Sequence, residues 1–112
     1  MKVILITGCS SGFGMLSAAR LAAAGHTVYA TMRNLDKKNE LLNEVNRRSA
    51  KIHLLRLDVT DNVSIVTAIR QVEAEQGRLD ILINNAGYGI GGFFEDLTEG
   101  EIREQMETNF FG

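Results

Sequence analysis

The sequence predicts an α/β fold, a doubly wound parallel β-sheet with helices packed on both of its faces. Short apolar runs alternate along the chain with longer helical segments, which is the pattern of strands joined by helical crossovers. The first apolar run, at residues 3–6, leads into a glycine-rich turn and then into an Ala/Leu-rich segment. This run and a second one at 80–84 are largely apolar, as expected for strands that are covered on both faces.

The first half of the chain contains two strand–helix pairs. The first strand covers residues 3–6, and the helix after it covers 12–24, with Gly25 as its C-terminal stop. The second pair is a strand at 26–32 and an amphipathic helix at 36–48. Three apolar residues of this helix are expected to face inward: Leu41, Leu42 and Val45.

The second half continues the alternation. A third strand at 52–57 mixes polar and apolar residues, which suits an edge position, and a helix at 62–76 follows it. The fourth strand, at 80–84, is apolar and is expected to be central. A glycine-rich loop at 88–95 comes next, and a last helix begins near Thr98, where the sequence has the form of a capping box.

Right-handed crossovers and the doubly wound rule predict the strand order 3-2-1-4, a Rossmann-type arrangement. Ligands of such sheets bind outside the carboxyl ends of the strands where the winding reverses, here strands one and four. The two loops richest in glycine follow these same two strands. We expect the sheet to be truncated after the fourth strand and the helix behind it. The outer edge of the fourth strand would then be unpaired, and a further part of the chain or a partner would complete the fold.

Composition indicates a single domain over residues 1–112, large enough for a core. A net charge of −2 gives no reason to expect a nucleic-acid or membrane-surface partner, and no apolar run approaches the roughly 20 residues of a membrane span. The single cysteine, Cys9, is consistent with a cytoplasmic location. No His/Cys cluster has the spacing of metal ligands, so no metal site is expected.

The turn after the first strand reads Thr7-Gly8-Cys9-Ser10-Ser11-Gly12-Phe13-Gly14. Gly8 would make the tight turn, Gly12 would let the backbone approach phosphates, and Gly14 would let the new helix pack on the strand. The side chains of Ser10 and Ser11 would bond phosphate oxygens or the turn itself. A tight connection without a ligand is the alternative, because three glycines in a turn are by themselves a weak signal.

Four segments resemble the short-chain dehydrogenase/reductase family, in the right order and on the right elements. They are the glycine turn with its wide first interval, Asp58-Val59, Asn84-Asn85-Ala86-Gly87, and Thr108-Asn109-Phe110-Phe111-Gly112. The resemblance implies a cofactor-binding domain of an oxidoreductase that transfers hydride between a nicotinamide and a small carbonyl or alcohol substrate. It implies these cofactor-binding residues: Thr7, Gly8, Ser10, Ser11, Gly12, Phe13, Gly14, Arg33, Asp58, Val59, Asn84, Ala86 and Gly87. It also implies Asn109 as a catalytic residue and a homo-oligomer for the whole enzyme.

The chain departs from the family in one respect. Tyr29 and Tyr88 are its only tyrosines, and Arg33 and Gly92 stand four positions after them where the family's Tyr-x-x-x-Lys pair would have lysine. We therefore expect the 112-residue chain to be inactive by itself. A non-catalytic NADP(H)-binding sensor or regulatory module is the alternative. A P-loop phosphotransferase is excluded, because no Gly-Lys-Ser/Thr follows the turn.

Several assignments leave a second interpretation open. Arg33 follows strand two, where an acidic residue would bind the ribose of NAD, so it indicates NADP(H) in preference to NAD(H); a solvated surface arginine is the alternative. Asp58 would accept a hydrogen bond from the adenine or would cap helix three. Cys9 is either a reactive thiol or, as we expect, a small apolar filler. Asn109 shares the inward face of the last helix and serves either a proton relay or a local hydrogen bond.

Overall fold

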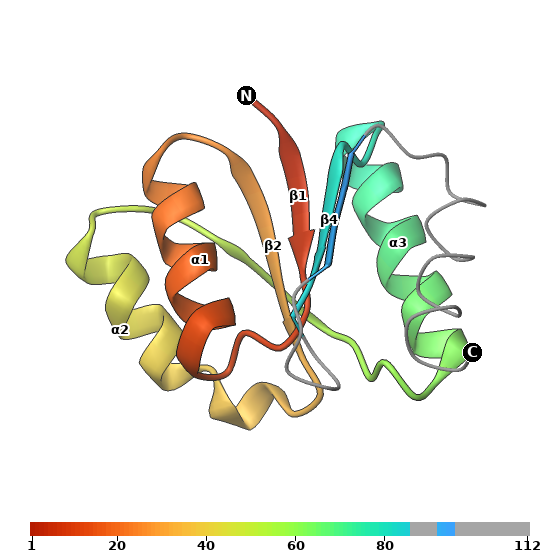
Figure 1. Cartoon of the computed structure of the whole chain (residues 1–112), viewed down its shortest axis with the longest axis horizontal. Helices are drawn as coiled ribbons and strands as arrows, with labels where there is room; N and C mark the ends of the chain where they lie inside the picture. Colours follow the sequence, from red (N-terminus) through yellow and green to blue (C-terminus); the bar gives the residue numbers. More distant parts are fainter. Residues whose placement is uncertain (86–91, 96–112) are drawn as a thin grey trace.

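The computed structural model describes residues 1–85 and the backbone of residues 92–95. Five strands form one sheet in the order β3-β2-β1-β4-β5 (Figure 1). The first four strands are mutually parallel, whereas β5 runs antiparallel to β4. The strands are β1 (Val3–Ile6), β2 (Thr27–Met32), β3 (His53–Arg56), β4 (Ile81–Asn84) and β5 (Gly92–Glu95).

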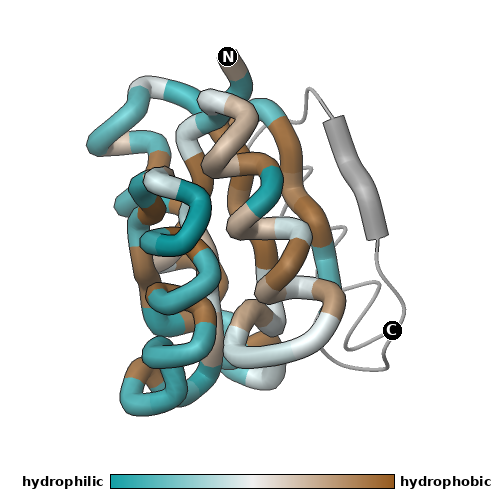
Figure 2. Tube along the Cα trace, turned by 90° about the vertical axis from the view of Figure 1, so that its left-hand side faces the viewer, coloured by the Kyte–Doolittle hydropathy of each residue, from teal (hydrophilic) through white to brown (hydrophobic). Residues whose placement is uncertain are grey.

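Helices cover both faces of the sheet, with α1 and α2 on one side and α3 on the other (Figure 1). Figure 2 looks onto the first face, where α1 carries more apolar residues than the mostly hydrophilic α2. The helices are α1 (Gly12–Ala23), the short 3₁₀ helix η1 (Leu35–Lys37), α2 (Asn39–Arg47) and α3 (Asn62–Gln76).

Alternation along β1 builds two separate cores. Ile4 and Ile6 pack with the alanines of α1 and with Leu41 of α2, while Val3 and Leu5 pack with α3. All four residues of β1 are at most 2% exposed, as the period of two in a doubly covered strand requires. The central strand is therefore fixed from both sides, which places the turn after it firmly at the carboxyl edge of the sheet.

The predicted parallel order 3-2-1-4 is confirmed, and β3 lies at the sheet edge as its mixed composition predicted. The predicted helix at 36–48 is wrong at its start, because the chain first makes η1 and begins α2 at Asn39. The Asn34 side chain caps η1, because it accepts a hydrogen bond from the backbone of Asp36 at 3.0 Å. Of the three residues expected to face inward, Leu41 and Val45 are buried and Leu42 is half-buried.

The predicted loop at 88–95 is also wrong in part, because its last four residues form β5. The outer edge of β4 is therefore paired, contrary to the prediction, through the register Ile83↔Phe93 and its neighbours. An open strand edge pairs readily with any extended segment, and glycine-rich composition hides such a segment from sequence patterns. The helix predicted to begin near Thr98 lies outside the described residues.

Candidate functional site

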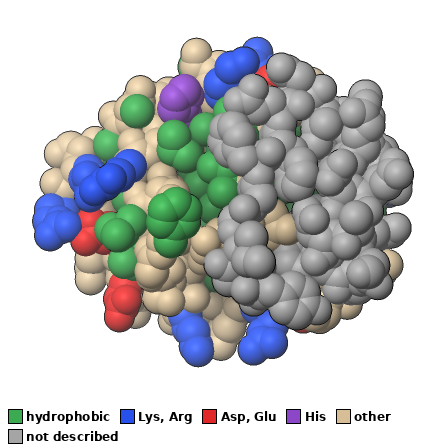
Figure 3. Space-filling view, viewed as in Figure 1, with side chains coloured by type: hydrophobic (Ala, Val, Ile, Leu, Met, Phe, Trp, Pro, Cys, Tyr) green, Lys and Arg blue, Asp and Glu red, His purple; other side chains and the backbone are tan. Residues whose placement is uncertain are grey.

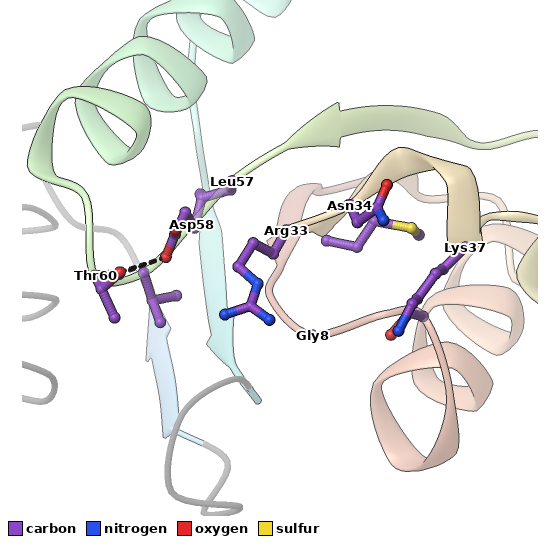
Figure 4. A pocket seen from close by; sticks show the side chains of 10 residues that line it. Gly8, Arg33, Asn34, Lys37, Leu57, Asp58 and Thr60 are labelled. Atoms are coloured by element: carbon purple, nitrogen blue, oxygen red, sulfur yellow. Dashed lines mark hydrogen bonds between the residues drawn. The ribbon is translucent and has the colours of Figure 1, made fainter.

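A cavity of about 570 Å³ opens at the carboxyl edge of the sheet, within the usual size range of small-molecule sites. Segments that follow three neighbouring strands, β1, β2 and β3, line it (Figure 4). Lys and Arg side chains are visible at the lower rim in Figure 3, the side on which the strands end in Figure 1. The lining residues are Gly8, Ser10, Met32, Arg33, Asn34, Lys37, Leu57, Asp58, Val59 and Thr60.

Glycine is required at different positions of the first turn for different structural reasons. Gly8 and Gly12 adopt φ angles of 69° and 62°, which side-chain-bearing residues rarely take. At Gly14 a Cβ atom would collide with the carbonyl oxygen of Gly8 and the side-chain amide of Asn85. The predicted reasons for Gly8 and Gly14, a tight turn and close packing of the helix, therefore agree with the geometry.

The N-terminus of α1 is left open. Its N-cap residue, Ser11, makes no side-chain capping hydrogen bond, and a Cβ atom on Gly12 would meet nothing within 4 Å. The N-terminus of α3 contrasts with it, because the Asp61 carboxylate accepts hydrogen bonds from the backbone of Val63 and Ser64 at 3.0 and 3.5 Å. Within the described residues, α1 thus presents first-turn N–H groups that its own cap residue does not satisfy.

The side chains of the glycine turn differ in their exposure. Ser10 is half-buried and lines the cavity, Ser11 is exposed, and Phe13 is 70% exposed on the first turn of α1. Cys9 is fully buried, and its thiol donates to the carbonyl of Ile6 at 3.3 Å. Burial raises the pKa of the Cys9 thiol to about 12, so this cysteine is an unreactive filler, as expected.

Hydrogen bonds tie the glycine turn to the end of β4. The Thr7 hydroxyl donates to Asn84 Oδ1 at 3.3 Å and accepts from the backbone N–H of Asn85 at 2.9 Å. The Asn85 side chain donates to the carbonyl of Gly8 at 3.2 Å. The buried Asn84 amide thus fixes Thr7. Asn85 belongs to the motif quoted from the sequence, but it was not among the predicted cofactor-binding residues.

Asp58 and Arg33 face the cavity from neighbouring strand ends (Figure 4). The Asp58 carboxylate accepts hydrogen bonds from the Thr60 hydroxyl at 2.7 Å and from its backbone N–H at 3.0 Å. These bonds, together with the nearby Arg33 and Arg56 guanidinium groups, hold the pKa of the Asp58 carboxyl below its usual value. Asp61 caps α3, so the capping alternative for the Asp58 side chain is removed.

The remaining predicted site residues fall in two groups. Val59 is half-buried on the cavity wall beside the buried Leu57. Ala86, Gly87 and Asn109 lie outside the described residues. Lys37 lines the cavity, but sequence reasoning missed it because nothing in the local pattern shows that η1 turns this side chain toward the turn.

Within residues 1–85 and 92–95, no group of three His, Cys, Asp or Glu side chains could hold a metal ion. No helix among these residues is both long and apolar enough to cross a membrane.

A family model described as short chain dehydrogenase matches residues 2–112. Among curated proteins, the 3-ketodihydrosphingosine reductase of Bacteroides thetaiotaomicron is 49% identical over 111 residues, which are 99% of this chain and 38% of the reductase. The chain therefore spans less than two-fifths of the length of this relative.

Solved structures agree with this match. A metagenomic short-chain oxidoreductase in complex with NADP has a TM-score of 0.70 at 30% identity, over 77% of this chain and 39% of that one. NAD⁺-bound xylitol dehydrogenase has a TM-score of 0.68 at 29% identity, over 78% of this chain and 34% of that one. The family binds NAD(P), and these two structures hold different nucleotides. The chain belongs to the short-chain dehydrogenase family.

Proposed function

We propose that this chain is the cofactor-binding part of an NADP(H)-dependent oxidoreductase that acts on a small carbonyl or alcohol substrate. The observation that carries the proposal is the cavity at the carboxyl edge, which Gly8 and Ser10 of the turn leading into α1 line together with Arg33. When bound, the nicotinamide would accept or supply the hydride.

The geometry of the glycine turn fits a pyrophosphate. The open space at Gly12 lets an anion approach the backbone closely, and the first-turn N–H groups of α1 are available to it. The positive end of the helix dipole favours the same charge. We propose that Gly8, Ser10, Ser11, Gly12, Phe13 and Gly14 hold the diphosphate, with Thr7 fixing the start of the turn.

Arg33 supports NADP(H) in preference to NAD(H). Its side chain is exposed and lines the cavity directly after β2, where the ribose of the adenosine is expected. A guanidinium there would bind a 2′-phosphate through charge-assisted hydrogen bonds, whereas the 2′-hydroxyl of NAD would donate a hydrogen bond to a carboxylate. Asn34, the next residue, carries no charge that would oppose the phosphate.

The far wall of the cavity would receive the adenine. We propose that Asp58 accepts a hydrogen bond from its exocyclic amino group and that Val59 packs against the ring. The Asp58 carboxylate is already oriented by Thr60 and is held in the ionised form that accepts hydrogen bonds. Asn84, Ala86 and Gly87 would border the second ribose at the end of β4.

For the chemical step, we propose that Asn109 belongs to a proton relay and that residues 1–112 alone do not oxidise NADPH. A cytoplasmic location and assembly into a homo-oligomer stay predictions from the sequence. A non-catalytic NADP(H) sensor remains the second candidate, since Tyr29 and Tyr88 both lack a lysine four positions later. NADPH turnover by the protein expressed from its uninterrupted gene, with a panel of ketones, distinguishes the two.

Replacement of Arg33 by alanine tests the cofactor preference. Loss of hydrogen bonds to a charged group costs about 1.5–3 kcal/mol, so NADP⁺ should bind Arg33→Ala roughly 10- to 150-fold more weakly, while the affinity for NAD⁺ stays within about twofold. Isothermal titration calorimetry with both nucleotides measures this. Arg56→Ala is the matched control, because Arg56 is exposed at the end of β3 but does not line the cavity. Equal weakening of NADP⁺ and NAD⁺ binding would contradict the proposal.

A further inference from the structure

Lys37 is a second cation on the wall of the cavity that Arg33 lines. In Figure 4 Arg33 lies toward Asp58, and Lys37 lies on the side away from it. Lys37 also lines a neighbouring cavity of about 400 Å³ together with Ser10 and Ser11 of the glycine turn. Lys37 therefore lines both the cavity of Arg33 and the neighbouring cavity beside the glycine turn.

The place of Lys37 is set by η1. The Asn34 side chain accepts from the backbone of Asp36 at 3.0 Å, and the Asn34 carbonyl accepts from the backbone of Lys37 at 3.2 Å. The side-chain oxygen and the backbone carbonyl of Asn34 thus both stabilise one tight turn directly after Arg33. This turn brings a residue four positions after Arg33 back to the same cavity.

The charges of the cavity are unbalanced. In the part of the chain that the structure describes, neither Arg33 nor Lys37 forms an ion pair. Asp58 is the one carboxylate among the residues that line the cavity, and its Oδ1 accepts both hydrogen bonds from Thr60. The carboxylates of Asp36 and Glu40 line the neighbouring cavity and not this one. Two cations against one engaged carboxylate leave room for an anion.

We propose that Lys37 and Arg33 together hold the 2′-phosphate of NADP(H), so that discrimination against NAD(H) depends on both side chains. The inference rests on the function proposed above and extends it to a residue outside the predicted site. A phosphate monoester carries close to two negative charges and three terminal oxygens at neutral pH. A guanidinium engages two of these oxygens through its planar fork, which leaves the third for a compact ammonium group.

The test compares two lysines that are neighbours in sequence. The full chain, as its gene encodes it, is prepared as wild type, Lys37→Gln and Lys38→Gln, and calorimetry gives the dissociation constants of NADP⁺ and NAD⁺. Both variants lose one positive charge, but Lys38 lines neither cavity. We expect Lys37→Gln to weaken NADP⁺ binding about tenfold and to leave NAD⁺ within about twofold. Lys38→Gln should leave both within about twofold.

Further variants make every outcome decisive. Lys37→Arg retains the charge and should keep most of the preference for NADP⁺, and Lys37→Met, which also removes the charge, replaces Lys37→Gln in the comparison if circular dichroism shows that variant to be unfolded. Equal effects of Lys37→Gln and Lys38→Gln on NADP⁺ would overturn the inference. If Arg33→Gln abolishes the preference and Lys37→Gln does not, Lys37 has no part in it and the proposed function still stands. Equal binding of both nucleotides by the wild type would defeat the proposed function itself.

Discussion

At the scale of single residues, contacts of Gly14, Asn85 and Thr7 hold the glycine turn in shape. Gly14 has no side chain because the carbonyl of Gly8 and the amide of Asn85 occupy the space where a Cβ atom would stand. The Asn85 side chain bonds that same carbonyl, and the Thr7 hydroxyl links the turn to Asn84 and Asn85. The turn is therefore organised before any ligand binds, which reduces the ordering cost of binding.

Replacement of Gly14 by alanine should destabilise the fold by about 1–3 kcal/mol, the usual cost of overpacking, because one of the colliding atoms is backbone. Urea unfolding followed by circular dichroism measures the change. Gly77→Ala is the control, since a Cβ atom there meets nothing within 4 Å and only the strain of a φ of 77° applies. The contact argument fails if Gly14→Ala leaves the unfolding midpoint where it is in the wild type.

At the scale of elements, two helices begin at the same edge of the sheet, and only one of them has its first turn capped by a side chain. The Asp61 carboxylate satisfies the first turn of α3, which is thereby closed to ligands. The first turn of α1 follows a glycine with a left-handed backbone, and its cap residue leaves it open. Under the proposed function, this difference, more than the number of glycines, is what makes the N-terminus of α1 the place for an anion.

The cap of α3 makes a quantitative prediction. Asp61→Ala should lower the free energy of unfolding by about 1 kcal/mol, whereas Asp61→Asn should be close to neutral because the amide oxygen still accepts the same hydrogen bonds. Thermal and urea unfolding of the two variants provide the comparison. Should alanine and asparagine prove equally costly, the capping bonds would not be the source of the effect.

At the scale of the whole molecule, the sequence was sufficient for the parallel sheet and insufficient for its periphery. Continuous apolar runs and the glycine turn predicted β1 to β4 and their order, because burial on both faces leaves few other patterns. The strand at Gly92–Glu95 was missed, since pairing with the open edge of β4 overrides the weak strand preference of glycine. Lys37 was missed because it lies on a short 3₁₀ helix capped by Asn34, which the periodicity of the sequence does not show.

The cavity brings together residues from distant parts of the sequence. The turn after β1, the segment after β2 and the segment after β3 all end at one edge because the strands are parallel. Members of this family bind NAD(P), and the cavity at this edge is large enough to receive part of such a nucleotide.

The measurement that tests this central claim most directly is an amide NMR titration of the ¹⁵N-labelled full chain with NADP⁺. The account predicts the largest shift changes at the glycine turn, residues 8–14, and at Arg33, Lys37 and Asp58, with smaller changes for NAD⁺ at Arg33 and Lys37. The C-terminal turn of α3, residues 73–76, lies outside the cavity lining and should keep its shifts. Shift changes centred on α3, with the glycine turn unmoved at saturating nucleotide, would contradict the account.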